Sequence, residues 1–368
     1  MQVTFSSVPG DDLQETLVST ADAESVDGIL LLATPDEALG TAGFESVLQE
    51  LSVPIFGGIF PEIVHRGTNT DSGALVVGLA AEPAVTTIPN LSDPTTDFRE
   101  SLDPTLPAQG YETAFVFVDA YSECIEQFIQ ALFRTYSVDL NVIGGGAGSL
   151  DSESTPCLFT NDGVISDAAV VATLPAPTSI GVNHGWTEID GPFRVTDAAG
   201  STLHTLDGRP AFELYREVIE SHVGRTVTAE NFFEIAKSHP FGITRMDAEQ
   251  VVRDPFSVDD GSMSCFGHIP EGEFLSVLQG DPDSLVEAAR TAYDHAVSGD
   301  VDPAALLFFD CISRVLYLEC GFDRELAAVT DHELPVVGAL TIGEIANDGS
   351  GHLDYYNKTA VVGAIEDV

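Results

Sequence analysis

The chain has few basic residues, and almost none of them is lysine. Its 368 residues include 59 acidic and 14 basic side chains, for a formal net charge of -45, and its two lysines are Lys237 and Lys358. Nucleic-acid binding depends on basic contacts to phosphates, so this composition argues against a nucleic-acid partner. It also disfavours an anionic membrane surface, and no apolar run approaches the roughly 20 residues of a membrane span. We therefore expect no membrane insertion.

The excess acid is spread along the whole chain and is not gathered in one segment. Such a charge repels itself strongly at ordinary ionic strength. A Debye length of about 3 Å near 1 M salt would screen most of this repulsion. The pattern favours adaptation to a salt-rich cytoplasm, as in haloarchaea, over a local acidic interaction surface. We therefore expect an acidic, halophilic protein.

Cysteine pairs and a leader segment are also missing. The five cysteines are an odd number and form no CxxC motif, a pattern that fits a reducing compartment better than a disulfide scaffold. Residues 1–14 have neither the basic nor the apolar region of a signal peptide. Both observations predict a cytoplasmic protein.

Metal and haem motifs are absent as well. The nine histidines form no HxxxH, HxH or HExxH pattern, so we expect no zinc site. Without a CxxCH motif there is no covalent c-type haem. The sequence thus requires no cofactor. A non-covalent haem held by a single histidine would leave no motif, and that alternative stays open.

What the chain does have is an internal repeat. Three stretches share one plan: an apolar strand, a helix, a short apolar segment containing glycine, a loop and a closing strand. The opening strands are expected at residues 28–32, 114–118 and 304–309, the glycine-containing segments at 53–58, 141–146 and 334–339, and the closing strands at 73–79, 167–172 and 359–363. Continuous apolar strands of this kind are covered on both faces. The repeat predicts an α/β protein of duplicated strand–helix–strand units with mixed sheets.

Two helices and one boundary can also be placed. Apolar residues at helical spacing predict a helix over 125–136, with Ser122 as its cap. Asp281 followed by Pro282 predicts the start of a second helix, which Gly299 ends. Turn signals between residues 197 and 208 favour a module boundary there, giving modules over 1–205 and 206–368.

The most conspicuous local motif is the glycine run Gly144, Gly145 and Gly146, expected directly after a strand. Its spacing is neither that of a dinucleotide fingerprint nor that of a Walker loop. Consecutive glycines let backbone N–H groups approach an anion or a carboxylate closely. A tight turn that needs positive φ angles explains the run equally well.

Cys311 and Arg314 follow the apolar strand over 304–309. Residues just beyond the carboxyl end of a parallel strand commonly line sites in α/β sheets. A catalytic thiol would need a base and an oxyanion pocket, and the sequence places neither His332 nor His352 beside Cys311. Pocket lining and plain packing are the stronger interpretations of Cys311. Arginine is scarce here and binds carboxylates bidentately, which favours a ligand contact for Arg314.

Two further polar residues are candidates in the same region. Glu344 could meet a ligand amine or form a structural ion pair with Arg314, and the ion pair is slightly favoured. Asn357 lies just before the last strand, where its side chain could hold a turn or contact a ligand, and the turn is favoured. Together these residues give the candidate ligand site, which consists of Gly144, Gly145, Gly146, Cys311, Arg314, Glu344 and Asn357.

Several of these motifs resemble the FIST family, in the expected order and over nearly the whole chain. They are residues 143–148, 184–186, 193–196, 206–211 with Tyr215, 269–272, Phe309 with Cys311 and Arg314, 343–345, and Asn357 with Thr359. The first part is similar to the FIST N module and the second to the FIST C module. The resemblance implies a sensory, signal-transduction protein that binds small ligands, with amino acids or their derivatives suggested. One branch of the family is associated with haem and nitric-oxide sensing.

The leading hypothesis is therefore a stand-alone sensor that is not an enzyme. Its small ligand would bind near Gly144–Gly148 or near Cys311, Arg314 and Glu344, and would shift a population of conformations. The signal would pass to a separate output protein, such as a kinase or a chemotaxis component. The alternatives are a haem-based gas sensor, a cysteine-dependent hydrolase of small amides or esters, and a protein–protein adaptor without a ligand.

Overall fold

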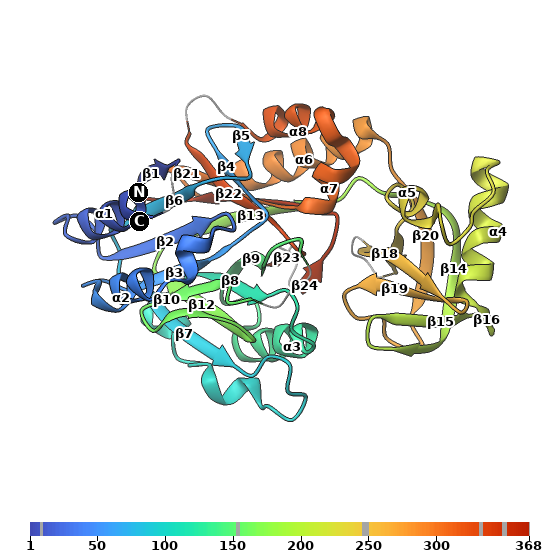
Figure 1. The fold of residues 1–368 in the computed structure, drawn as a ribbon, viewed down its shortest axis with the longest axis horizontal. Helices are drawn as coiled ribbons and strands as arrows, with labels where there is room; N and C mark the ends of the chain where they lie inside the picture. The colour runs from blue at the N-terminus through green and yellow to red at the C-terminus, as the bar shows by residue number, and fades with distance from the viewer. Residues whose placement is uncertain (8–9, 152–154, 245–249, 331–333, 348–351, 368) are drawn as a thin grey trace.

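The computed structural model describes residues 1–7, 10–151, 155–244, 250–330, 334–347 and 352–367 (Figure 1). Two parts are visible: a large part of three packed sheets, called the body below, and a small sheet beside it that carries α4 and α5. His332 lies outside the described residues.

The body consists of three α/β units with one strand plan, which confirms the predicted repeat. In each unit the first two strands are parallel, and the third is antiparallel to the first. The strands are β2 (Gly28–Ala33), β3 (Ile55–Ile59) and β6 (Ala74–Leu79); β8 (Thr113–Asp119), β9 (Asn141–Ala147) and β12 (Ala168–Leu174); and β21 (Ala305–Cys311), β22 (Val336–Thr341) and β25 (Ala360–Ile365). Every residue of these nine strands is buried except Asn141, the first residue of β9, as is expected for strands that are covered on both faces.

Helices connect the parallel strands within each unit. They are α2 (Ala42–Glu50), α3 (Ile125–Tyr136), and α7 (Ile312–Leu318) with α8 (Phe322–Val329). Two more helices precede a first strand, α1 (Asp11–Ala21) and α6 (Pro282–Val297), and 3-10 turns occur at Glu37–Gly40, Phe98–Ser101, Pro107–Gln109 and Glu319–Gly321.

The predicted start of α6 is confirmed, and the predicted cap of α3 is wrong. Asp281 caps α6 in a capping box with Ser284. Helix α3 begins after Cys124 without a side-chain cap. Ser122 does not cap it because its hydroxyl donates to Asp167, 3.2 Å away.

Each unit contributes a pair of strands to the sheet of another unit. The pairs are β4 (Glu62–His65) with β5 (Thr68–Thr70), β10 (Leu158–Thr160) with β11 (Gly163–Ile165), and β23 (Glu344–Asn347) with β24 (Leu353–Tyr356). The first pair extends the third sheet at β22, the second extends the first sheet at β3, and the third extends the second sheet at β9. Edge strands β1 (Gln2–Ser6), β7 (Ala84–Pro89) and β13 (Thr178–Asn183) complete three six-stranded sheets. This cyclic exchange ties the units into one body.

The inner faces of the three sheets meet in an aromatic core. Phe117 of β8 lies between Phe60 and Phe309, with ring centroids 5.5 and 5.7 Å apart. Alternate residues of β21 face opposite sides, so Phe309 joins this central core while Phe308 packs under the helices of the third unit. Burial of both faces thus fixes the register of each strand.

Between β13 and α6 the chain leaves the third unit and forms a small barrel. Its strands are β14 (Thr187–Ala199), β15 (Thr202–Leu206), β17 (Phe241–Ile243), β18 (Val251–Asp259), β19 (Ser262–Phe266) and β20 (Phe274–Gln279), and β14 pairs with β15 to close the sheet. The short β16 (Arg209–Pro210), α4 (Ala211–Val223) and α5 (Phe232–Ala236) complete it. The boundary expected between residues 205 and 206 lies within β15, so both expected modules contribute strands to the barrel.

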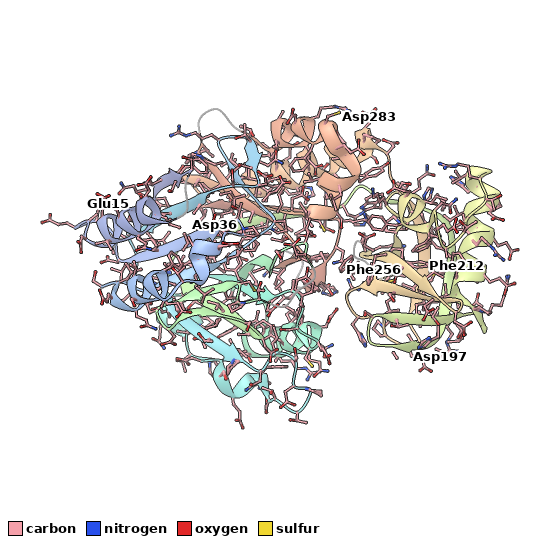
Figure 2. All side chains as sticks on the ribbon, in the orientation of Figure 1. Glu15, Asp36, Asp197, Phe212, Phe256 and Asp283 are labelled. Atoms are coloured by element: carbon pink, nitrogen blue, oxygen red, sulfur yellow. The ribbon has the colours of Figure 1, made fainter. Side chains whose placement is uncertain are left out.

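Acidic side chains are distributed around the whole molecule (Figure 2). Glu15 on α1, Asp36 beside α2, Asp197 on the barrel and Asp283 on α6 are all exposed and lie on separate parts of the surface. These four acids are therefore not gathered in one patch.

Candidate functional site

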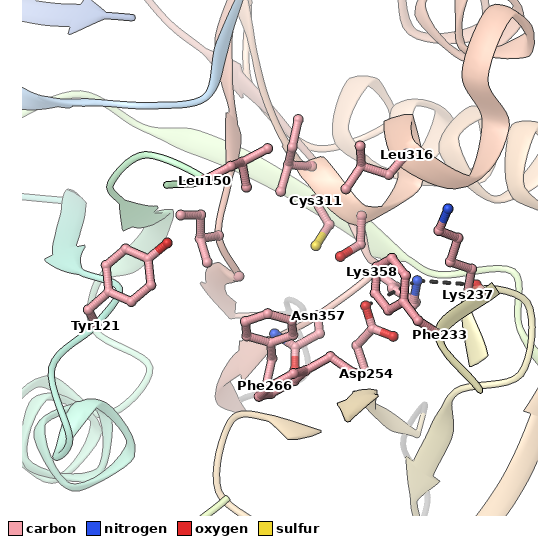
Figure 3. Close-up of a pocket in the computed structure, with 15 residues that line it drawn as sticks. Tyr121, Leu150, Phe233, Lys237, Asp254, Phe266, Cys311, Leu316, Asn357 and Lys358 are labelled. Carbon is pink, nitrogen blue, oxygen red and sulfur yellow. Dashed lines mark hydrogen bonds and ion pairs between the residues drawn. The ribbon is translucent and has the colours of Figure 1, made fainter. Parts of the chain in front are cut away.

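A cavity of about 330 Å³ lies between the barrel and the body, and it is called the barrel–body cavity below (Figure 3). The body supplies residues from its second and third units, and the barrel supplies residues from α5, β18 and β19. The lining residues are Tyr121, Leu150, Cys311, Ile312, Ser313, Leu316, Ile342, Gly343, Asn357 and Lys358 of the body, and Phe233, Lys237, Asp254, Phe256 and Phe266 of the barrel.

The topology of the third unit explains where this cavity forms. Cys311 is the last residue of β21, and Ile342 and Gly343 follow its parallel neighbour β22. In α/β sheets the carboxyl ends of parallel strands leave an open crevice. Here the barrel, inserted in the same unit, covers that crevice from the other side.

Cys311 is joined to the buried carboxyl of Glu344. Its thiol hydrogen-bonds to Glu344, which also accepts from the hydroxyl of Thr341 at 2.8 Å and from the backbone N–H of Thr359 at 3.2 Å. Burial raises the pKa of Glu344 to about 8, although these hydrogen bonds favour the ionised form. Burial, and the nearby Glu344, also raise the pKa of the Cys311 thiol. At neutral pH both groups hold their protons, so this pair supplies a hydrogen-bonding wall and no thiolate.

Asn357 and Lys358 form the bend between β24 and β25 at the floor of the cavity. Lys358 has a φ of 50°, a left-handed conformation that is costly for a residue with a side chain. Its backbone carbonyl is held by the indole N–H of Trp186 at 3.0 Å and by Arg314 at 3.2 Å. The Oδ1 atom of Asn357 is buried and has no hydrogen-bond partner among the described residues. Asn357 lines the cavity, so this buried acceptor belongs to the cavity wall.

The ammonium of Lys358 links the body to the barrel. It lies 3.1 Å from the carboxylate of Asp254 on β18 and donates to the backbone carbonyl of Lys237 at 3.2 Å. Asp254 also accepts a hydrogen bond from Ser313. Burial raises the pKa of Asp254 against the opposing effect of Lys358. One wall of the cavity is thus a set of polar contacts that cross between the two parts.

Arg314 lies behind this wall, fully buried, and does not line the cavity. Its guanidinium donates to Glu325 at 2.8 Å and pairs with Asp310 at 3.1 Å. It also donates to the backbone carbonyls of His184, Leu285 and Lys358. The partners of Arg314 are thus Asp310 and Glu325, whereas Glu344 bonds to Thr341, Thr359 and Cys311. Arg314 is on α7, four residues after Asp310, which is in β21, so these two partners are close in the chain.

The buried acids around Arg314 carry more negative charge than one guanidinium balances. Burial raises the pKa of Asp310 and of Glu325, and the two carboxyls hydrogen-bond to each other. A hydrogen bond between two carboxyls requires a shared proton, because an ionised carboxylate is only an acceptor. The cluster therefore retains at least one proton when folded.

The glycine run has a packing role in the structure and is not part of the lining of the barrel–body cavity. Strand β9 extends through all three glycines, so the expectation that they follow the strand is wrong. A Cβ on Gly144 would lie 2.0 Å from the carbonyl oxygen of Val116, and one on Gly146 would lie 2.3 Å from that of Ile342. The N–H of Gly146 donates to Gly343, 2.8 Å away. Close strand contact, in place of a turn or an anion cradle, accounts for the run.

The mouth of the cavity is apolar. Leu150, Phe233, Phe266 and Leu316 are large hydrophobic residues that are 37–50% exposed, and all four line the cavity. They come from different elements of the body and the barrel and converge around one opening (Figure 3). Exposed apolar residues gathered at one place commonly mark a binding site.

The lining does not fit a haem or a metal ion. None of its residues is a histidine, and burial raises the pKa of the Cys311 thiol, which disfavours the thiolate that a metal would need. Across the described part of the chain, no cluster of three His, Cys, Asp or Glu side chains could hold a metal.

Sequence reasoning placed Cys311 and Asn357 at the site but missed its barrel half. Asp254, Lys237 and the three phenylalanines become neighbours of Cys311 only through the fold. One signal was available: the chain has two lysines, and both line this cavity.

Comparison with known proteins identifies the class to which this architecture belongs. The FIST N domain matches residues 27–209 and the FIST C domain matches residues 211–347. The chain belongs to the FIST family, whose domains are associated with sensory signal transduction and the binding of small ligands.

One relative is an uncharacterized protein of Methanocaldococcus jannaschii. It is 23% identical over 197 residues, which cover 49% of this chain and 38% of that protein. The chain thus matches well under half of the relative's length, and the relative indicates neither a ligand nor an activity. Among the helices of the described residues, none is long and apolar enough to cross a membrane.

Proposed function

We propose that this protein is a cytoplasmic sensor that binds a small ligand in the barrel–body cavity and does not transform it. The observation that carries the proposal is the composition of the cavity. The barrel and the body each supply part of its wall, and the buried Oδ1 of Asn357 has no hydrogen-bond partner among the described residues. A buried acceptor without a donor costs about 1–3 kcal/mol, which a ligand N–H or O–H would recover. Amino acids or their derivatives are the ligands suggested by the family.

The position of the cavity supports a signalling role. A ligand that touches both the barrel and the body stabilises the arrangement in which both surfaces face it. Lys358 and Asp254 already couple the two parts at the cavity floor. The output would pass to a separate protein, such as a kinase or a chemotaxis component, that distinguishes the two arrangements.

A ligand screen by thermal shift in concentrated KCl tests the binding proposal. A ligand at a hundredfold excess over its Kd stabilises the native state by about 2.7 kcal/mol. We expect Phe233→Ser to reduce the shift given by any hit, because Phe233 lines the cavity. Phe274→Ser is the matched control, since Phe274 is 47% exposed and Phe233 is 45% exposed, but Phe274 lies outside the lining. Equal loss in both variants, or no ligand from any class, would contradict the proposal and favour an adaptor.

Substitution of Cys311 tests whether the protein transforms its bound ligand. We expect Cys311→Ala to keep ligand binding, and we expect the wild-type protein to release its ligand unmodified after long incubation, as mass spectrometry would record. The raised pKa of the thiol supports this expectation. Turnover of the bound ligand that Cys311→Ala abolishes would replace the sensor with the cysteine-dependent hydrolase.

A further inference from the structure

The charge of the barrel–body cavity is opposite to that of the whole protein. The chain carries a formal charge of -45, yet the cavity is lined by two ammonium groups and one carboxylate. The two ammonium groups belong to Lys237 and Lys358, the chain's full complement of lysine. A protein with so few lysines that places both in one small cavity has a local requirement for positive charge there.

Lys237 is the more accessible of the two lysines, with 21% of its side chain exposed against 1% for Lys358. An ammonium has three donors, and that of Lys358 contacts Asp254, the carbonyl of Lys237 and, at 5.5 Å, the ring of Trp186. Lys237 pairs at 3.0 Å with Glu234, whose side chain is 72% exposed. An ion pair with one partner in solvent contributes little, so a ligand carboxylate can replace Glu234 at Lys237.

The rest of the cavity suits an apolar group. Phe233, Phe256 and Phe266 come from the barrel, and Leu150 and Leu316 face them from the body. A volume of about 330 Å³ is at the lower end of the usual range for ligand sites. The occupant is therefore a small molecule with a ring or a branched aliphatic chain, and not a nucleotide.

The net charge of the cavity lining and its buried hydrogen-bond acceptor narrow the class of ligand further. The lining carries one surplus positive charge, which matches one negative charge better than the two charges of a dianion such as a phosphate monoester. The ammonium of a zwitterion would have to lie beside two lysines, with the one lining carboxylate already paired to Lys358. The buried Oδ1 of Asn357, which has no partner among the described residues, would accept one hydrogen bond from a neutral N–H or O–H group of the ligand.

From these four observations we infer that the ligand is a small organic monocarboxylate with an apolar body and a neutral hydrogen-bond donor, such as a hydroxy acid or an N-acylated amino acid. The inference rests on the proposed binding function and specifies its ligand. The carboxylate contacts Lys358 and Lys237, the donor reaches Asn357, and the apolar body lies among the phenylalanines.

Four probes with one skeleton test this class by calorimetry at constant KCl concentration. They are 3-phenyllactate, its neutral amide 3-phenyllactamide, the zwitterion phenylalanine, and 3-phenylpropionate, which lacks the donor. We expect 3-phenyllactate to bind at least about tenfold more tightly than each of the others. Equal or tighter binding of the amide or of phenylalanine would overturn the inference.

Charge variants locate the carboxylate. Lys237→Met keeps the apolar stem and removes the charge, and we expect it to weaken 3-phenyllactate about tenfold while leaving 3-phenyllactamide unchanged. Lys358→Met is combined with Asp254→Asn so that no buried carboxylate loses its partner, and we expect the same selective loss. Arg324→Met, on an exposed pair with Asp283, is the control for net charge and should bind like the wild type. Unchanged binding of 3-phenyllactate in both lysine variants would overturn the inference.

Reductive methylation with ¹³C-formaldehyde gives a second measurement at Lys237, because the other lysine, Lys358, is buried against Asp254. We expect 3-phenyllactate to shift the signal of Lys237 and to leave that of the N-terminus in place. If the open screen finds a neutral or cationic ligand that needs Phe233 but neither lysine, the sensor stands and the monocarboxylate fails. If 3-phenyllactate binds through the lysines and is then consumed, the ligand class stands and the sensor fails.

Discussion

Arg314 determines the shape of the site without reaching it. Its contacts join the bend at Lys358, the segment at His184 that enters the barrel, and the first turn of α6. Each of these segments comes from a different part of the chain, and their carbonyl groups need a donor once buried. A guanidinium, with five donors in a fixed plane, can serve them together.

Replacing Arg314 should therefore destabilise the whole folded protein and not merely weaken ligand binding. Removing one partner from a buried ion pair costs about 3–5 kcal/mol, because the other charge remains buried. We expect Arg314→Met to lower the free energy of unfolding by this amount in chemical denaturation, and Arg314→Lys to restore little of it. The exposed Arg324→Met should change stability by no more than about 1 kcal/mol. A stable Arg314→Met protein with impaired ligand binding would instead place Arg314 in the ligand site.

Glu344 gives the folded protein a distinctive pH dependence. Its pKa is about 8 in the folded state and 4.5 ordinarily, so between these values the folded chain keeps a proton that the unfolded chain has lost. Raising the pH then favours unfolding, by at most about 1.4 kcal/mol per pH unit for one group. His184, whose pKa is lowered by burial to about 3, acts in the opposite direction but only below its ordinary 6.5.

Stability should accordingly fall between about pH 6.5 and 8, where the buried carboxyls act without opposition from His184. Denaturant titrations across this range measure it. We expect Glu344→Gln to make the fall shallower, since the amide cannot ionise, while Asp310 and Glu325 continue to contribute to it. A wild-type protein with constant stability over this interval would show that Glu344 is already ionised in the folded state.

At the scale of elements, one glycine in each unit sets how closely the parallel strands approach. Gly57, Gly144 and Gly338 occupy the same register position, opposite Leu31, Val116 and Phe308. A Cβ at any of them would lie 1.7–2.0 Å from a backbone carbonyl oxygen of the neighbouring strand. The repeated glycine in the sequence is therefore a requirement of strand packing.

Gly144→Ala should destabilise the protein by about 3 kcal/mol or more, because the backbone of β8 cannot move away from the added methyl group. Gly40→Ala is the control, since a Cβ there meets nothing within 4 Å and the change should stay within about 0.5 kcal/mol. Urea unfolding of the two variants provides the comparison. Similar midpoints for both would mean that the strands of the second unit can separate at little cost.

The whole molecule must tolerate a charge of -45 distributed over its surface. Screening lengths fall from about 10 Å at 0.1 M salt to about 3 Å at 1 M, so repulsion between surface carboxylates weakens steeply over this range. We expect the thermal midpoint to rise with KCl, and more than with sucrose at equal osmolality, as circular dichroism would record. Equal effects of KCl and sucrose would show that charge repulsion is not what limits stability.

The arrangement of barrel and body also belongs to this largest scale. The barrel is inserted in the third unit, yet its cavity-facing residues contact the bend at Asn357 and Lys358 near the end of the chain. Contacts between Arg253 and the carbonyl of Tyr355 at 3.0 Å, between Glu126 and the backbone N–H of His268, and between Lys358 and Asp254 are polar. Polar interfaces between domains of one chain permit relative motion, which the proposed signalling would use.

The sequence alone determined the units of the body. Their strands are continuous apolar runs and their helices have apolar residues at helical spacing, and both patterns are local, so the repeat, the start of α6 and the extent of α3 were predictable. The family also followed from local motifs, and two residues of the predicted ligand site, Cys311 and Asn357, line the cavity. Two predictions were wrong because of tertiary contacts. The hydroxyl of Ser122 donates to Asp167 and does not cap α3, and β9 continues through the glycines because β23 pairs with it there.

Only the tertiary structure decided which units exchange strand pairs, that residues 187–279 close into a barrel, and that this barrel covers Cys311. Each depends on contacts between residues far apart in the chain, and such contacts leave no periodicity to recognise. The buried partners of Arg314 and the convergence of Lys237, Asp254 and Lys358 have the same origin. The chain specifies its strands through neighbouring residues, whereas its binding site arises from where the completed sheets meet.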